Sequence, residues 1–158
     1  MHLTGSGREA TSKGVAPSDN EAVRSTFDED MKSELRRMAV ELCEVYSPPR
    51  VTSMAETMGI KAGEAMDLTT GWDFRKEADR RRAREYVEKY KPLLLIGSPM
   101  CQMFSQLQTM NWWSPERQAR WCEAVEHIRF VVELYKMQVE AGRMFLHEHP
   151  TRASSWQL

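Results

Sequence analysis

The spacing of apolar residues predicts two long helices. Over residues 20–40 and again over 122–139, apolar side chains recur at intervals of three or four, as on the buried stripe of an amphipathic helix. The segment 114–116, Ser-Pro-Glu, is a strong start for the second helix, because it supplies a capping hydroxyl, a proline at the first helical position and an acid near the positive end of the dipole. Gly142 is positioned to end that helix.

Short apolar runs bounded by proline, glycine and charged residues predict strands. They cover residues 42–46, 64–68, 93–96 and 144–147, with a shorter run over 71–74. Shorter helices are predicted between them over 51–58, where Gly59 follows as a left-handed cap, and over about 76–90. Strands that alternate with helices predict an α/β fold with an open, mainly parallel, Rossmann-like sheet and helices on both faces.

Length and composition divide the chain into a short polar segment and one domain. Residues 1–19 are rich in Gly, Ser and Thr and show no apolar period, which is typical of a flexible arm or a linker. The remaining residues, 20–158, are sufficient for one α/β domain with a buried core.

Net charge and cysteine content bear on the partners of the protein and on the compartment in which it acts. The net charge is only −1 with 28% charged residues, so overall charge argues neither for nor against a polyanionic partner. Three cysteines, Cys43, Cys101 and Cys122, are odd in number and not spaced as a metal site, which predicts free thiols in a reducing compartment. No apolar run approaches the roughly 20 residues of a membrane span. We therefore expect an intracellular protein, in the nucleus or the cytoplasm, with no membrane partner.

The most informative segment is 97–105, Gly-Ser-Pro-Met-Cys-Gln-Met-Phe-Ser, which directly follows the strand predicted over 93–96. It presents Cys101 just past the carboxyl end of that strand. The strand predicted over 144–147 runs in the same way into Glu148. Because open α/β sheets bind ligands beyond the carboxyl ends of their strands, the sequence predicts a site with one thiol and one acid at this edge.

These motifs resemble those of the DNA (cytosine-5) methyltransferases. In that family the fourth strand is followed by Gly-x-Pro-Pro-Cys-Gln-x-Phe-Ser, and the fifth ends in Glu-Asn-Val or Glu-Asn-Pro. Here Glu148-His149-Pro150 takes the place of the second motif, and Met100 replaces the second proline of the first. The positions that match the first motif are Gly97, Pro99, Cys101, Gln102, Phe104 and Ser105.

The resemblance implies the first two thirds of a class I S-adenosylmethionine-dependent methyltransferase fold, incomplete at its C-terminus. Cys101 would be the nucleophile that adds to carbon 6 of a flipped-out cytosine, and Glu148 would hold the ring near nitrogen 3. Asp67 would bind the ribose hydroxyls of S-adenosylmethionine, and Asp73 would lie near its adenine. The other positions implied by the motifs are Tyr46, Ser47 and Pro99 for the cofactor and Gln102 and Ser105 for DNA.

The first strand departs from the family pattern. Where the family has an aromatic residue and a Gly-x-Gly turn that lets the backbone approach the cofactor, this chain has Tyr-Ser-Pro-Pro-Arg over 46–50, and proline has no amide to donate. The family's later Gln-x-Arg-x-Arg motif is also absent from the sequence. Residues 41–156 resemble, in addition, a segment of retroelement polyproteins of unicellular eukaryotes. The alternative hypothesis is therefore a catalytically inactive module of a longer polypeptide with a structural or nucleic-acid-binding role.

Three further patterns have two interpretations each. Arg80 and Arg82 lie in a basic cluster that would contact phosphates, or that is simply the solvated face of a charged helix. The pair 112–113, Trp-Trp, would stack on a base or pack its loop onto the following helix. Alternation along a strand sends His147 and His149 to one face and Glu148 to the other, so we expect no metal site there.

Overall fold

The computed structural model describes residues 40–105 and 114–158 and contains a parallel sheet of four strands. The strands pair in the order β2-β1-β3-β4, and every neighbouring pair is parallel. The α/β class and the parallel sheet expected from the sequence are therefore confirmed. The strands are β1 (Leu42–Val45), β2 (Ala62–Met66), β3 (Leu94–Gly97) and β4 (Met144–His147).

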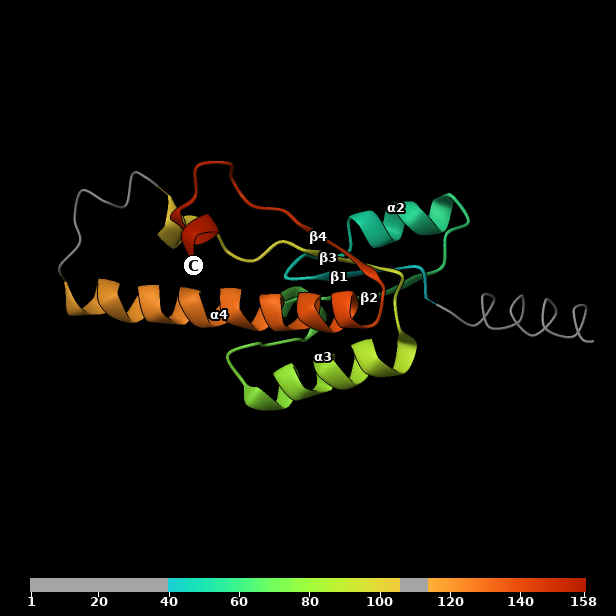
Figure 1. The fold of residues 1–158 in the computed structure, drawn as a ribbon, viewed down its shortest axis with the longest axis horizontal. Helices are drawn as coiled ribbons and strands as arrows, with labels where there is room; N and C mark the ends of the chain where they lie inside the picture. Colours follow the sequence, from blue (N-terminus) through green and yellow to red (C-terminus); the bar gives the residue numbers. More distant parts are fainter. Residues whose placement is uncertain (1–39, 106–113) are drawn as a thin grey trace, which may run out of the picture. The chain divides into compact units, whose positions relative to one another are not determined.

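Helices cover both faces of the sheet, as predicted (Figure 1). The short helix α2 (Val51–Thr57) lies over one face, and α3 (Glu77–Tyr90) and α4 (Pro115–Glu140) lie over the other. The hydroxyl of Ser114 accepts a hydrogen bond from the amide of Arg117 at 3.2 Å, which is the cap predicted for α4. Single 3-10 turns complete the chain: η1 (Leu68–Thr70), η2 (Gln102–Phe104) and η4 (Ser154–Gln157).

The two central strands alternate their side chains between two layers of core. Cys43 and Val45 of β1 pack with the residues of α3 and α4, in the larger cluster. Leu42 of β1 and Ile96 of β3 pack on the opposite side with Ala55 of α2. Every residue of β1 is buried, as expected for a parallel strand with helices on both faces.

The predicted elements agree with the structure except between β2 and α3. The strand expected over 64–68 lies two residues earlier, and the strand expected over 71–74 is wrong. There the amide of Trp72 donates to the carbonyl of Asp67, which closes a turn instead of joining the sheet. Trp72 and Phe74 are buried in the core, so their apolar character reflects packing. The predicted arm over 1–19, the predicted helix over 20–40 up to residue 39, and Trp112-Trp113 lie outside the described residues.

The connections create a crevice at the carboxyl ends of β1 and β3. The chain leaves β1 through α2 on one face to reach β2, and it leaves β3 through α4 on the opposite face to reach β4 (Figure 1). The segments that follow β1 and β3 therefore diverge, although the strands are hydrogen-bonded neighbours. In open α/β sheets this divergence marks the place where ligands bind.

Candidate functional site at the carboxyl edge of the sheet

A cavity of about 360 Å³ opens at this crevice. Its walls come from the ends of β1, β2 and β3 and from the first half of α4. Three of the five positions that the family resemblance implies for the cofactor line it, namely Tyr46, Asp67 and Asp73. The other lining residues are Leu68, Trp72, Phe74, Arg75, Ser98, Met100, Glu123 and His127.

Tyr46 forms the floor of the cavity in an unusual backbone conformation. Its φ is 61°, a left-handed value that costs a bulky residue of the order of 1–2 kcal/mol. The phenol oxygen lies 2.8 Å from Nδ1 of His127, and the ring packs on Phe74 with a centroid distance of 4.7 Å. Burial raises the pKa of Tyr46 and lowers the pKa of His127, so at neutral pH this wall is an uncharged hydrogen-bonded pair.

Asp67 lines the cavity and caps the turn η1. Its Oδ1 accepts from the amide and the hydroxyl of Thr69, at 2.9 and 2.7 Å, and its carboxylate also takes part in a capping box with Thr70. A carboxylate oxygen held in this way by its own turn is able to accept bonds from a ligand's hydroxyl groups.

Asp73, in contrast, is already paired. Its two oxygens accept from Nε and Nη2 of Arg75 at 2.8 and 3.0 Å. These hydrogen bonds lower the pKa of Asp73 to about 2. The carboxylate therefore has little capacity left for an adenine amino group, and the pair adds no net charge to the rim of the cavity.

The turn after β1 is bonded to a buried carboxylate of the protein itself. Glu44 is only 1% exposed, and its Oε2 accepts from the amides of Arg50 and Thr52 at 3.2 and 2.8 Å and from the Thr52 hydroxyl at 2.7 Å. Oε1 accepts from the hydroxyl of Ser47 at 2.9 Å. Burial alone would raise the pKa of Glu44, but the bonds from Thr52 and Ser47 outweigh it, so the pKa lies below its ordinary value.

The residues present therefore do not fit the amino-acid half of S-adenosylmethionine. Of the seven residues from Tyr46 to Thr52, Tyr46 donates its amide to Met66, Pro48 and Pro49 have no amide to donate, and the amides of Arg50, Val51 and Thr52 bond to Glu44. Only the amide of Ser47 is left outside this account, and a ligand carboxylate at the turn would lie beside the Glu44 carboxylate, which already takes most of the donors. The cavity beside it has the size and the acceptor for the nucleoside half only.

Cys101 and Glu148 lie on loops that meet beyond β3 and β4. The amide of Glu148 donates to the carbonyl of Gly97 at 2.8 Å, and the ring centroids of Phe104 and His149 are 5.7 Å apart. Cys101 is half-buried and Glu148 is exposed. The structure thus brings the predicted thiol and acid to one edge, next to the cavity that Met100 lines.

The other predicted site residues lie away from the cavity. Ser47 is buried against Glu44, and Pro99 is buried after β3. Gln102 is exposed and Ser105 is half-buried at the two sides of η2.

The two arginines of the predicted phosphate-binding cluster are paired on α3. Nη1 of Arg82 bonds to Asp79 at 3.1 Å, and its guanidinium stacks 3.5 Å above the ring of Trp72. Arg80 lies 3.1 Å from Glu77. Contact with a phosphate would compete with these ion pairs.

Metal-ligand clusters and membrane-spanning helices are absent from the described part of the chain. No three His, Cys, Asp or Glu side chains among residues 40–105 and 114–158 come close enough to hold a metal ion. His147 and His149 do share a face, with ring centroids 5.2 Å apart. In the same ranges, no helix combines the length and the apolar character needed to span a membrane.

Comparison with models of protein families, with curated proteins and with solved structures finds no match for the chain.

Sequence reasoning missed the two residues that decide the chemistry of the site. Glu44 is a charged residue in the middle of a strand that is buried on both faces, and a charge in that position calls for buried donors nearby. This signal was available in the order Leu-Cys-Glu-Val over 42–45. His127 lies on the buried face of α4 but outside the apolar spacing expected over 122–139, and nothing in its position along the sequence indicates that it would meet Tyr46.

Proposed function

We propose that this chain is a catalytically inactive methyltransferase-like module whose cavity at the carboxyl edge binds a nucleoside or an unstacked base of a nucleic acid. The observation that carries the proposal is the Glu44 carboxylate, which takes the amides of Arg50 and Thr52 at the start of α2. The module would act within a longer polypeptide, such as the retroelement polyproteins that the sequence resembles, in a structural or nucleic-acid-binding role.

The walls of the cavity support a nucleoside as the ligand. A volume of about 360 Å³ lies in the range of small-molecule pockets, about 300–1,000 Å³. Tyr46 is half-buried and supplies an aromatic ring against which a base can pack, and the buried rings of Trp72 and Phe74 make the wall beside it apolar. The Asp67 carboxylate is an acceptor for ribose hydroxyls.

Calorimetric titration of the chain with adenosine, S-adenosylmethionine and S-adenosylhomocysteine tests the proposal. We expect adenosine to bind and the two larger ligands to bind no more tightly, because Glu44 takes most of the donors that their amino-acid half would need. Asp67→Asn should weaken adenosine binding about tenfold, or about 1.4 kcal/mol, while the Oδ1 cap of η1 is kept. If adenosine gives no heat with folded protein, the nucleoside proposal is wrong; if S-adenosylmethionine binds tenfold more tightly than adenosine, the module is not an inactive one.

DNA cytosine methylation is the second candidate, favoured by the position of Cys101 and Glu148 on adjoining loops at the carboxyl edge. In this reaction the Cys101 thiolate would add to carbon 6 of cytosine, and the electron pair of the carbon 5–carbon 6 double bond would be delocalised over carbon 5 and the ring toward nitrogen 3, beside Glu148. Carbon 5 would then take the methyl group from S-adenosylmethionine, and loss of its proton and of the thiolate would restore the double bond.

A single-stranded oligonucleotide with 2-pyrimidinone in place of cytosine, whose carbon 6 is more electrophilic, tests this step without a cofactor. A covalent adduct in denaturing mass spectrometry that is lost in Cys101→Ser would favour the enzyme. An intact protein mass after long incubation would rule out Cys101 as a nucleophile in this chain.

A further inference from the structure

The strand β4 forms an unprotected edge of the sheet. Among the described residues it pairs with β3 only, so the outer row of its backbone groups has no strand partner. Met144, Phe145 and Leu146 are 54%, 43% and 48% exposed. Proteins usually protect such edges with charged residues, proline or a covering segment, and β4 itself carries none of these.

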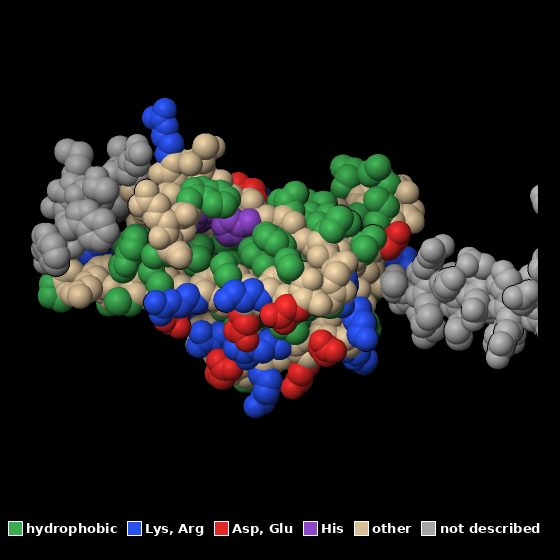
Figure 2. All heavy atoms as spheres, in the orientation of Figure 1, with side chains coloured by type: hydrophobic (Ala, Val, Ile, Leu, Met, Phe, Trp, Pro, Cys, Tyr) green, Lys and Arg blue, Asp and Glu red, His purple; other side chains and the backbone are tan. Residues whose placement is uncertain are grey.

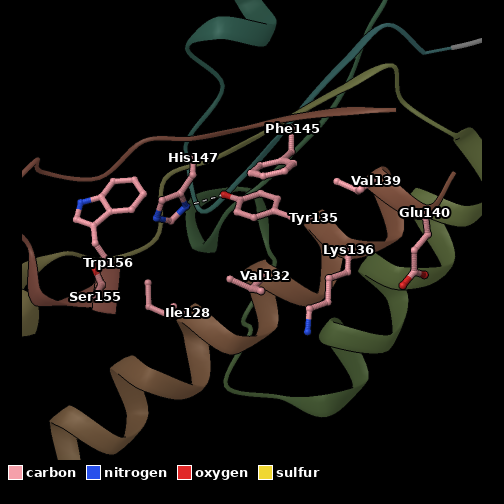
Figure 3. Close-up of a pocket in the computed structure, with 10 residues that line it drawn as sticks. All are labelled: Ile128, Val132, Tyr135, Lys136, Val139, Glu140, Phe145, His147, Ser155 and Trp156. Atoms are coloured by element: carbon pink, nitrogen blue, oxygen red, sulfur yellow. Dashed lines mark hydrogen bonds between the residues drawn. The ribbon is translucent and has the colours of Figure 1, made fainter. Parts of the chain in front are cut away.

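An apolar groove of about 400 Å³ runs between β4 and α4. The rings of Tyr135 and Phe145 stack within it at a centroid distance of 4.4 Å, and the Tyr135 hydroxyl lies 2.9 Å from Nδ1 of His147 (Figure 3). Trp156 closes one end of the groove (Figure 3). The space-filling view shows the surrounding patch of hydrophobic side chains, with charged side chains along its lower border (Figure 2).

The α4 side of this groove carries one positive and one negative residue. Lys136 and Glu140 are exposed and lie one helical turn apart. Both line the groove on the side opposite Phe145 (Figure 3). In the part of the chain that the structure describes, neither has an ion-pair partner, whereas Glu133, two helical turns before Glu140, is bonded to Arg84.

We propose that the face formed by β4 and the groove side of α4 binds a second copy of this chain, through a two-fold axis that joins the two sheets at β4. A two-fold axis places the same patch on both sides of the contact. Two antiparallel α4 helices then bring Lys136 of each copy to Glu140 of the other. This self-complementary pair of charges is what favours a second copy over an unrelated strand.

The directions of the side chains fix which registers the two β4 strands can adopt. Phe145 and His147 face α4, and residues directly opposed in an antiparallel pair point to the same face of a sheet. Each residue of β4 must therefore pair with a residue that faces the same side of the sheet: odd-numbered residues pair with odd-numbered ones and even with even. A ladder centred on Phe145 then places Met144 opposite Leu146 of the second copy. The apolar residues of the groove, such as Val139, are then buried between the two α4 helices.

Charge reversal at Lys136 and Glu140 tests the contact without touching its apolar part. Analytical ultracentrifugation of the 158-residue chain should give a dimer with a dissociation constant near the micromolar range. K136E and E140K each place like charges across the axis. Each should raise the dissociation constant about tenfold or more, which corresponds to about 1.4 kcal/mol. An equimolar mixture of the two variants should associate again, because each now carries the charge that the other lacks, and so should the double variant.

Three results would overturn the proposal. One is a wild-type chain that stays monomeric up to about 100 μM, a concentration that any association of micromolar affinity would saturate. Another is a dimer that neither single variant weakens. The last is a mixture of the two single variants that remains monomeric while circular dichroism shows both to be folded. E88K, which reverses an exposed charge on α3, is the matched control and should leave the dimer unchanged.

Discussion

The buried carboxylate of Glu44 gives the sharpest prediction for the stability of this fold. It accepts four hydrogen bonds, three of them at one oxygen. Hydrogen bonds to a charged group contribute about 1.5–3 kcal/mol each, against about 0.5–1.5 for neutral pairs. Glu44→Gln keeps the shape and weakens these bonds, but it also removes the cost of burying a charge. We therefore expect a loss of about 1–2 kcal/mol in the free energy of unfolding at pH 7.

Glu44→Ala should cost more, about 3–5 kcal/mol, because it leaves the amide and hydroxyl of Thr52 buried without an acceptor. Urea denaturation followed by circular dichroism measures both losses. Glu41→Gln is the matched control: this exposed side chain at the start of the same strand accepts one bond, from the amide of Lys61, and its replacement should change stability by no more than about 0.5 kcal/mol.

The pH dependence provides an independent check on the same group. Because the pKa of Glu44 is lowered in the folded state, its contribution is complete above the ordinary glutamate value of about 4.3 and is lost as the pH falls through the lowered value. The wild type should therefore lose the advantage over Glu44→Gln in this acid range. A Glu44→Ala variant as stable as the wild type, or an advantage that does not change with pH, would refute the argument.

Three other predictions concern the core and the site. Burial lowers the pKa of His127, so protonation favours the unfolded chain and stability should fall as the pH drops below about 6.5. In thermal unfolding curves, His127→Gln should make stability depend less on pH in this range, and an unchanged pH dependence would contradict the argument. Gly97→Ala should lower the free energy of unfolding by about 1–3 kcal/mol, because a Cβ there would collide with the Tyr135 hydroxyl. In urea denaturation, adding Tyr135→Phe should recover part of this loss, and a Gly97→Ala variant as stable as the wild type would show that α4 shifts freely. Cys101→Ser should change the urea midpoint little, since this thiol is half-buried at a strand end; loss of cooperative unfolding would instead identify it as a core residue.

The spacing of apolar residues and the capping residues correctly predicted those helices and strands whose ends are marked within their own segment. The helix α4 begins at Pro115 and ends at Glu140, as its cap and helical period indicate, and β4 covers the four residues expected. The stripe expected to be buried over 122–139 is wrong in part: Cys122, Val132 and Val139 are exposed, because α4 turns the face with Ala124, Val131 and Leu134 to the core. The prediction of a strand over 71–74 failed for a reason that spacing cannot reveal. Trp72 and Phe74 alternate as in a strand, yet their backbone closes a turn on Asp67 and only their rings enter the core.

The candidate site was likewise predictable from the sequence only in part. The order of elements indicated Cys101 and Glu148, because residues that follow strands gather at one edge of a parallel sheet whatever the details of packing. Tyr46 and Asp67 were implied by the resemblance to the methyltransferase family. The sequence could not tell that the turn after β1 is closed by Glu44, since that depends on side-chain hydrogen bonds made when α2 folds back over the strand. Nor could it pair Tyr46 with His127, which are 81 positions apart.

The order of strands, helices and motifs along this protein was thus determined by its sequence, through the periods of apolar residues and the residues that cap and end each element. The tertiary structure decided which polar groups remain free to bind anything. Whether a donor is free depends on every group that folding brings within hydrogen-bond distance, and here folding brings a carboxylate of the chain itself to the turn that a cofactor would need.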